Sequence, residues 1–119
     1  MPGIVFVKTT RLEEVTKFYL ELGATIWLQQ PDITILRHGN LLFGLHQQPS
    51  ETKDVLLTFF YQKKEEVVEM YEKLSDIALS PPKTNKKYNI FHFFVKDPEK
   101  RIVEFQVFLH EIDYNFSEN

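Results

Sequence analysis

Residues 4–22 read IVFVKTTRLEEVTKFYLEL, and residues 56–74 read LLTFFYQKKEEVVEMYEKL. The two stretches match at a constant offset of 52 residues (56 minus 4), which aligns their apolar beginnings, a Glu-Glu-Val triplet, a tyrosine and a leucine. A match at this distance, occurring only twice, is too long-range for a helical solenoid. It indicates a duplicated module in which an apolar strand is followed by an amphipathic helix.

The two expected helices carry end signals. Thr10 and Glu13 stand three residues apart before the first apolar stripe, as in a capping box, so we expect the Thr10 hydroxyl to cap that helix. Gly23 follows the last apolar residue of the stripe and provides a left-handed stop. In the second copy, Glu65 and Glu66 stand in the first turn, where the helix dipole favours negative charge.

After each helix, strand-like segments are separated by turn signals. The segment PPKTNKK contains the only basic cluster, Lys83 to Lys87, and we expect it to be a solvated loop. Two alternating apolar runs flank the short turn Asp97–Arg101, which predicts a hairpin. The expected strands after the helices are 25–29, 33–37 and 41–46 in the first copy, and 77–79, 89–96 and 102–109 in the second.

Two βαβββ modules, together with the phrase FFVKDPEKRIVEF at 93–105, resemble the vicinal oxygen chelate superfamily, the glyoxalase/bleomycin resistance protein/dioxygenase fold. The Phe-Tyr pair followed by Leu-Gly-Ala at 18–24, and the Leu-Ser-Pro-Pro run at 79–82, resemble other parts of that family's pattern. Lys100 departs from it, because glycine is usual there. The resemblance implies an α+β fold in which two βαβββ modules form a curled mixed-sheet cleft with the helices on the outer face. We expect one domain over 1–119, with module one at 1–50, module two at 54–110 and an acidic tail at 111–119.

Composition excludes several classes of protein. A chain of 119 residues with 43% hydrophobic residues can build the core of one domain. With no cysteine there is neither a disulfide framework nor a thiolate site, and we expect a cytoplasmic protein. A formal charge of -3 does not indicate nucleic-acid binding, which usually requires a basic surface. This mild acidity is compatible with a cationic ligand, but it is too small to indicate the charge of the ligand. The apolar runs are too short to predict a membrane-spanning segment.

The resemblance marks four positions for metal ligands, on the first and last strand of each module. The residues there are Ile4, Gly44, Leu56 and Glu104, of which only Glu104 can bind a metal. A catalytic divalent site normally needs about three protein ligands, so we predict no metal and no other cofactor. The alternative is a non-standard site made of Glu104, His92 and His46.

Pairing around the predicted hairpin turn places Phe94 opposite Glu104 and His92 opposite Gln106. His92 and Glu104 are therefore candidates for an acid–base pair, while the alternative is a buried histidine satisfied by its neighbours. The resemblance and strand alternation together predict which strand residues face the cleft. The cleft then either holds a ligand or is filled by these side chains. The candidate ligand-binding residues are Phe6, Leu42, His46, Leu56, Thr58, Phe60, Phe94 and Gln106.

The leading hypothesis is a metal-free small-molecule binding protein of the glyoxalase/bleomycin resistance type, which holds an apolar or aromatic ligand in its cleft. The alternative is a lyase- or isomerase-type enzyme that uses Glu104 with His92 or a non-standard metal. A third hypothesis is a structural partner protein with a closed cleft. Eleven phenylalanines in so short a chain favour a buried interface, and family members of this length commonly dimerise, so we expect a homodimer.

Overall fold

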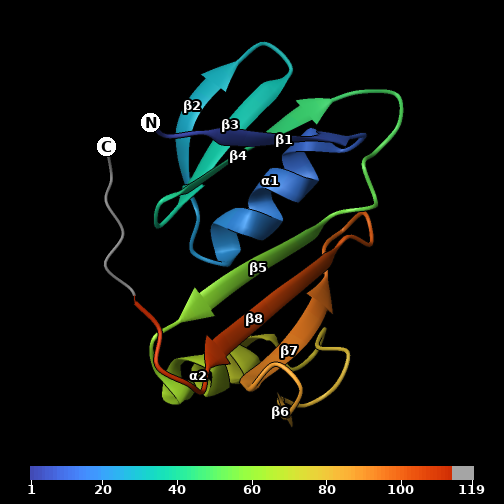
Figure 1. Ribbon diagram of the computed structural model, residues 1–119. Coiled ribbons are helices and arrows are strands. Elements are labelled where there is room, and N and C mark those ends of the chain that lie inside the picture. Colours follow the sequence, from blue (N-terminus) through green and yellow to red (C-terminus); the bar gives the residue numbers. More distant parts are fainter. Residues whose placement is uncertain (114–119) are drawn as a thin grey trace. The chain divides into compact units, whose positions relative to one another are not determined.

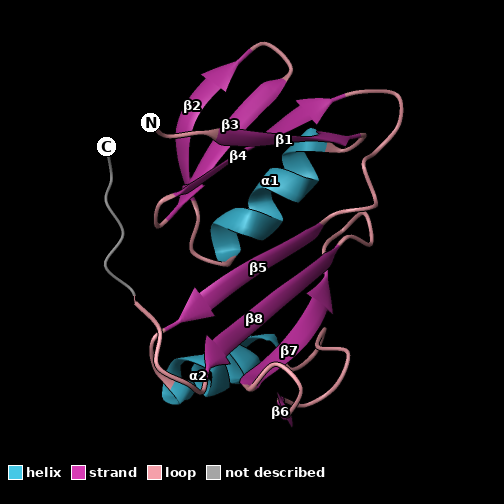
Figure 2. Ribbon diagram, viewed as in Figure 1, coloured by secondary structure: helices cyan, strands magenta, loops and turns pink. Residues whose placement is uncertain are grey.

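The computed structural model describes residues 1–113 and divides them into two compact units, 1–53 and 54–113. Each unit has one helix and one four-stranded mixed sheet (Figures 1 and 2). The predicted α+β architecture of two βαβββ modules is therefore confirmed. Residues 114–119 of the expected acidic tail lie outside the described residues.

The first unit consists of β1 (Ile4–Thr9), α1 (Leu12–Glu21), β2 (Thr25–Gln30), β3 (Ile33–His38) and β4 (Leu41–Gln47). Its strand order is β1-β4-β3-β2, with β1 parallel to β4 and the other pairs antiparallel. Helix α1 packs on one face of this sheet, where the Tyr19 ring meets Phe43 edge-on at 5.2 Å between centroids. Both side chains are fully buried, so this contact lies in the core.

The second unit consists of β5 (Leu56–Tyr61), α2 (Lys64–Leu74), β6 (Lys83–Asn85), β7 (Ile90–Lys96) and β8 (Ile102–Phe108). Its order is β5-β8-β7-β6, the same topology as in the first unit. Helix α2 packs on its sheet through Tyr71, whose ring lies 5.5 Å from that of Phe93. Neither described helix is long and apolar enough to cross a membrane.

The start of α1 corrects one prediction. The residue at the N-cap is Arg11, and Thr10 does not cap the helix. The Leu12 N–H donates instead to Gln47 Oε1 at 2.9 Å, and Gln47 Nε2 donates to the Thr10 carbonyl at 2.8 Å. The Gln47 side chain, at the end of β4, therefore satisfies a free backbone N–H in the first turn of α1. Its amide accepts one hydrogen bond and donates another, and its side chain is longer than that of threonine. Gly23 takes a left-handed φ of 110°, as expected of a helix stop.

The basic segment corrects a second prediction. Lys83–Asn85 is not a solvated loop but the edge strand β6, paired with β7. The stretch at 77–79, which was expected to be a strand, makes only an isolated bridge between Ala78 and Val95. Pro81 and Pro82 have no N–H to donate, so sheet pairing resumes only after them.

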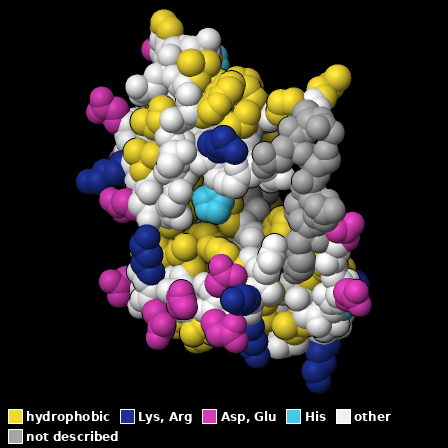
Figure 3. Space-filling model, turned by 90° about the vertical axis from the view of Figure 1, so that its left-hand side faces the viewer, with side chains coloured by type: hydrophobic (Ala, Val, Ile, Leu, Met, Phe, Trp, Pro, Cys, Tyr) yellow, Lys and Arg dark blue, Asp and Glu magenta, His cyan; other side chains and the backbone are white. Residues whose placement is uncertain are grey.

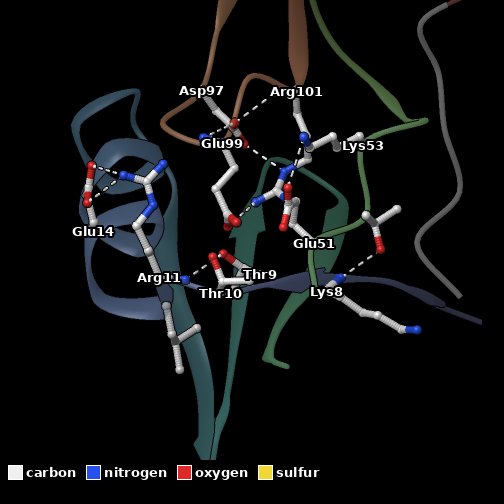
Figure 4. Close-up of polar contacts among 12 residues, drawn as sticks. Lys8, Thr9, Thr10, Arg11, Glu14, Glu51, Lys53, Asp97, Glu99 and Arg101 are labelled. Atoms are coloured by element: carbon white, nitrogen blue, oxygen red, sulfur yellow. Dashed lines mark hydrogen bonds and ion pairs between the residues drawn. The ribbon is translucent and has the colours of Figure 1, made fainter. Parts of the chain in front are cut away.

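The predicted hairpin of β7 and β8 is confirmed, and a buried charge cluster holds its turn (Figure 4). The Asp97 carboxylate accepts the N–H groups of Glu99 and Arg101 at 2.8 and 3.0 Å. Arg101, which is fully buried, donates to Asp97 at 2.8 Å and to Glu99 at 3.3 Å. Lys100 adopts φ 68°, so a lysine takes the left-handed conformation that the family pattern gives to glycine.

Apolar side chains also remain exposed on the first unit. Ile26, Trp27 and Leu28 on edge strand β2 are 44%, 50% and 42% exposed. Hydrophobic side chains gather in the upper part of Figure 3, at the height of this strand. On the opposite edge strand, Val5 and Phe6 are each 51% exposed.

Candidate ligand-binding site

The second unit carries a polar group of three side chains, of which His92 and Glu104 are buried and Thr58 is half-buried. Strand register places Glu104 of β8 beside Thr58 of β5 and Phe94 of β7. Thr58 Oγ1 donates to Glu104 Oε1 at 2.8 Å, and His92 Nδ1 lies 2.6 Å from Glu104 Oε2. His92 and Glu104 are each only 7% exposed, so both ends of the carboxylate find partners inside the protein.

The contact with Glu104 selects the form of the His92 ring. When Glu104 is ionised it only accepts hydrogen bonds, and Nδ1 then carries the proton that joins the two side chains. Nε2 is then the ring nitrogen left to interact with another group. The imidazole stands edge-on to the Phe94 ring at 4.9 Å between centroids, which restricts its rotation.

His92 and Glu104 line a hollow of about 500 Å³, and the lining residues that the structure describes all belong to the second unit. Its size falls within the range of small-molecule sites, and its walls are mostly apolar or aromatic with a few polar groups at defined places. The lining residues are Leu56, Asn85, Tyr88, Ile90, His92, Phe94, Glu104, Gln106 and Phe108.

Several residues named from the sequence meet here. Leu56, Phe94 and Gln106 line the hollow with His92 and Glu104. Thr58 reaches it indirectly, through its hydrogen bond to Glu104. Phe60 is 41% exposed and does not line the hollow, but its ring lies 5.8 Å from that of the lining residue Phe108.

Four lining residues were missed by the sequence reasoning. Ile90 and Phe108 stand two residues from His92 and Gln106 on the same strands, so strand alternation alone could have found them. Asn85 and Tyr88 could not be found in that way, because they depend on β6. That strand lies in a segment expected to be a loop.

The other three candidate residues, Phe6, Leu42 and His46, belong to the first unit. Phe6 is the register partner of Gly44, and its ring covers that glycine: Phe6 Cζ lies 3.2 Å from the place where a Cβ of residue 44 would stand. His46 Nε2 accepts a hydrogen bond from Gln48 Nε2 at 3.0 Å. The ring of Phe6 thus takes the space that a longer side chain at position 44 would need.

The donor set does not fit the divalent metal that the fold family implies. Three of the four marked positions hold Ile4, Gly44 and Leu56, which have no side-chain donor, and Glu104 uses both oxygens in hydrogen bonds. Across residues 1–113, no three His, Asp or Glu side chains form a group that could hold a metal ion. Of the alternative set, Glu104 and His92 meet in the second unit, whereas His46 belongs to the first.

Comparison with known proteins identifies the fold. No protein-family model matches the sequence, and no curated protein matches it. A glyoxalase/bleomycin resistance protein/dioxygenase from Nocardioides matches the structure with a TM-score of 0.76 at 18% identity, over 98% of this chain and 89% of that one. An integron cassette protein from the mobile metagenome of the Halifax Harbour sewage outfall matches with a TM-score of 0.78 at 19% identity, over 90% and 97%.

Lactoylglutathione lyase from Agrobacterium tumefaciens is also similar, with a TM-score of 0.70 at 17% identity over 90% of this chain and 92% of that one. The class defined by these matches is that of α+β proteins built from paired βαβββ modules. This chain has the vicinal oxygen chelate fold of the glyoxalase/bleomycin resistance protein/dioxygenase structures.

Proposed function

We propose that the protein binds an apolar or aromatic small molecule in the hollow of its second unit, without a metal ion. The observation that carries the proposal is the composition of that hollow. Ile90, Phe94 and Phe108 provide apolar walls, while His92 and Gln106 offer a small number of oriented polar atoms. Such a combination is typical of sites that hold a ligand by burial and orient it by one or two hydrogen bonds.

A neutral aromatic probe tests the proposal. N-phenyl-1-naphthylamine fluoresces when it leaves water, so its titration into the protein reports binding. Phe94→Ala removes a ring that lines the hollow, and Phe91→Ala removes the same ring from the opposite face of the same strand. We expect Phe94→Ala to weaken binding about tenfold, because losing part of an aromatic contact costs at least about 1.4 kcal/mol. Phe91→Ala should change affinity less than about twofold.

Two results would contradict the proposal. One is that the wild-type protein does not bind the probe or a panel of aromatic metabolites followed by thermal shift. The other concerns the metal: after incubation with Zn²⁺, Mn²⁺ or Fe²⁺ and gel filtration, elemental analysis should find the metal well below one ion per chain. Stoichiometric retention would mean that a metal belongs to the site.

A second candidate function rests on the pairing of His92 with Glu104. A carboxylate that orients an imidazole is an arrangement used in general acid–base catalysis, here for an isomerase- or lyase-type proton transfer next to a carbonyl group. Glu104→Gln keeps the shape of the side chain and removes its charge. An enzyme of this type should lose ligand C–H exchange in D₂O, measured by NMR, whereas a pure binding protein should keep its affinity for the neutral probe.

We also propose that the protein is a homodimer. The support is the apolar surface on both edge strands of the first unit, where Val5, Phe6 and Trp27 are about half exposed. Light scattering at micromolar concentration should give about twice the 14.2 kDa mass of one chain. A mass equal to one chain would refute this proposal.

A further inference from the structure

The basic segment that follows Pro82 forms one rim of the hollow. Lys83 is the register partner of His92, and Asn85 is the partner of Ile90. Side chains directly opposite each other in an antiparallel pair lie on the same face of the sheet. Because Asn85, Ile90 and His92 all line the hollow, Lys83 lies on the hollow's side of β6.

Two more lysines occupy the turn between β6 and β7. The turn is fixed by the Tyr88 N–H, which donates to Asn85 Oδ1 at 3.2 Å. Lys87 Nζ lies 5.4 Å from the centroid of the Tyr88 ring, and both Asn85 and Tyr88 line the hollow. Lys86 is the neighbour of Lys87 in this turn. Lys83 and Lys87 thus stand beside the hollow, and Lys86 precedes Lys87 in the same turn.

The rim lysines have no acidic partner in the part of the chain that the structure describes. Within the described residues, Lys83, Lys86 and Lys87 form no ion pair. Among residues 1–113, Glu104 is the only carboxylate that lines the hollow, and its oxygens are engaged by Thr58 and His92. The hollow therefore combines apolar walls with a surplus of positive charge on one side, although the whole chain carries a formal charge of -3.

We infer that the ligand of this site is an anion: an apolar or aromatic molecule that carries an acidic group such as a carboxylate. The inference rests on the proposed function and narrows it. The apolar body would lie against Ile90, Phe94 and Phe108, and the acidic group would face the β6 rim. His92 Nε2 and the Gln106 amide are further polar groups able to contact the ligand, because His92 Nδ1 is directed at Glu104.

Two probes of matched shape separate charge from burial. 8-Anilinonaphthalene-1-sulfonate and N-phenyl-1-naphthylamine share their ring system and differ by one sulfonate. The quantity to measure is the ratio of their dissociation constants at low ionic strength. In K83Q/K86Q/K87Q this ratio should shift against the sulfonate about tenfold, since each exposed charge contact contributes at most a few-fold. Binding of the neutral probe should not change.

Lys17→Gln is the matched control, because Lys17 is an exposed lysine on α1 of the first unit. It should leave the ratio unchanged. Raising the ionic strength from roughly 10 to 150 mM should reduce the wild-type preference towards that of the triple variant, as screening shortens the Debye length from about 30 to 8 Å.

The outcomes distinguish the two claims. If the neutral probe binds and the triple variant leaves the ratio unchanged, the anionic ligand is refuted while the proposed function stands. The same follows if Lys17→Gln changes the ratio as much as K83Q/K86Q/K87Q does. If neither probe binds the wild-type protein, the proposed function fails and this inference fails with it. A shift in the ratio that is confined to the rim lysines and is suppressed by salt supports the anion.

Discussion

The two units share a topology and differ at equivalent positions on one face of their sheets. In the second unit, Thr58 and Glu104 are register partners on the parallel strand pair, and they hydrogen-bond. In the first unit the equivalent pair is Phe6 and Gly44, and the ring of one covers the other. The same backbone arrangement thus supports a polar group in one unit and a packed aromatic ring in the other.

The neighbouring strands differ in the same sense. His92 pairs with Gln106 on β7 and β8, whereas Ile33 pairs with His46 on β3 and β4. The residue that would correspond to His92 is therefore apolar. Fold alone does not decide the chemistry of the face, because the positions of Glu104 and His92 are held by Gly44 and Ile33 in the first unit.

The largest expected effect on stability is the loss of the buried arginine at the hairpin turn of the second unit, compared with an exposed arginine near a turn of the first. Arg101→Met should lower the free energy of unfolding by about 3 to 5 kcal/mol, because it leaves the buried carboxylates of Asp97 and Glu99 without their counter-charge. Arg37→Met is the matched change in the first unit, where the exposed arginine donates to the Gly39 carbonyl at 2.9 Å. It should cost about 0.5 to 1.5 kcal/mol. Urea unfolding measures both, and equal losses would show that the cluster around Arg101 adds nothing.

The order of elements and the hairpin register were predictable because they depend on short-range signals. The 52-residue repeat located both modules, and the turn at Asp97 predicted that His92 faces Gln106 and Phe94 faces Glu104. A hairpin joined by a short turn leaves few registers, and a slip of one residue would move every side chain to the other face. The contact between His92 and Glu104 follows from this register.

What could not be predicted depends on side chains that meet across long stretches of chain. Gln47 satisfies the first turn of α1 from 35 residues away, so the local Thr10 signal was wrong. The ring of Phe6 covers Gly44, although neither residue alone indicates such a contact. The β6 strand forms only because β7 provides a partner for it, and its sequence, rich in lysine and asparagine, has low strand propensity.

A smaller effect is expected where Phe6 covers Gly44. Gly44→Ala adds a Cβ that collides with the Phe6 ring, so it should lower the free energy of unfolding by about 1 to 3 kcal/mol. The double variant Phe6→Ala/Gly44→Ala removes the collision and should be at least as stable as Phe6→Ala alone, since alanine suits a strand better than glycine. A double-mutant cycle by thermal or urea unfolding measures this coupling. Additive losses would mean that the ring moves aside freely and does not define the face of the first unit.

The smallest effect concerns His38, the last residue of β3 in the first unit. Burial lowers the pKa of His38, although its backbone hydrogen bond opposes the shift. The unfolded chain therefore binds a proton more readily than the folded one, so His38 should make the free energy of unfolding fall as the pH drops below about 6.5. His38→Asn should make the decline between about pH 7 and 5 shallower, as followed by urea unfolding at each pH. The exposed His110→Asn serves as the control. An unchanged slope in His38→Asn would show that burial of this ring has no linkage to folding, and that the acid sensitivity of the protein must arise elsewhere.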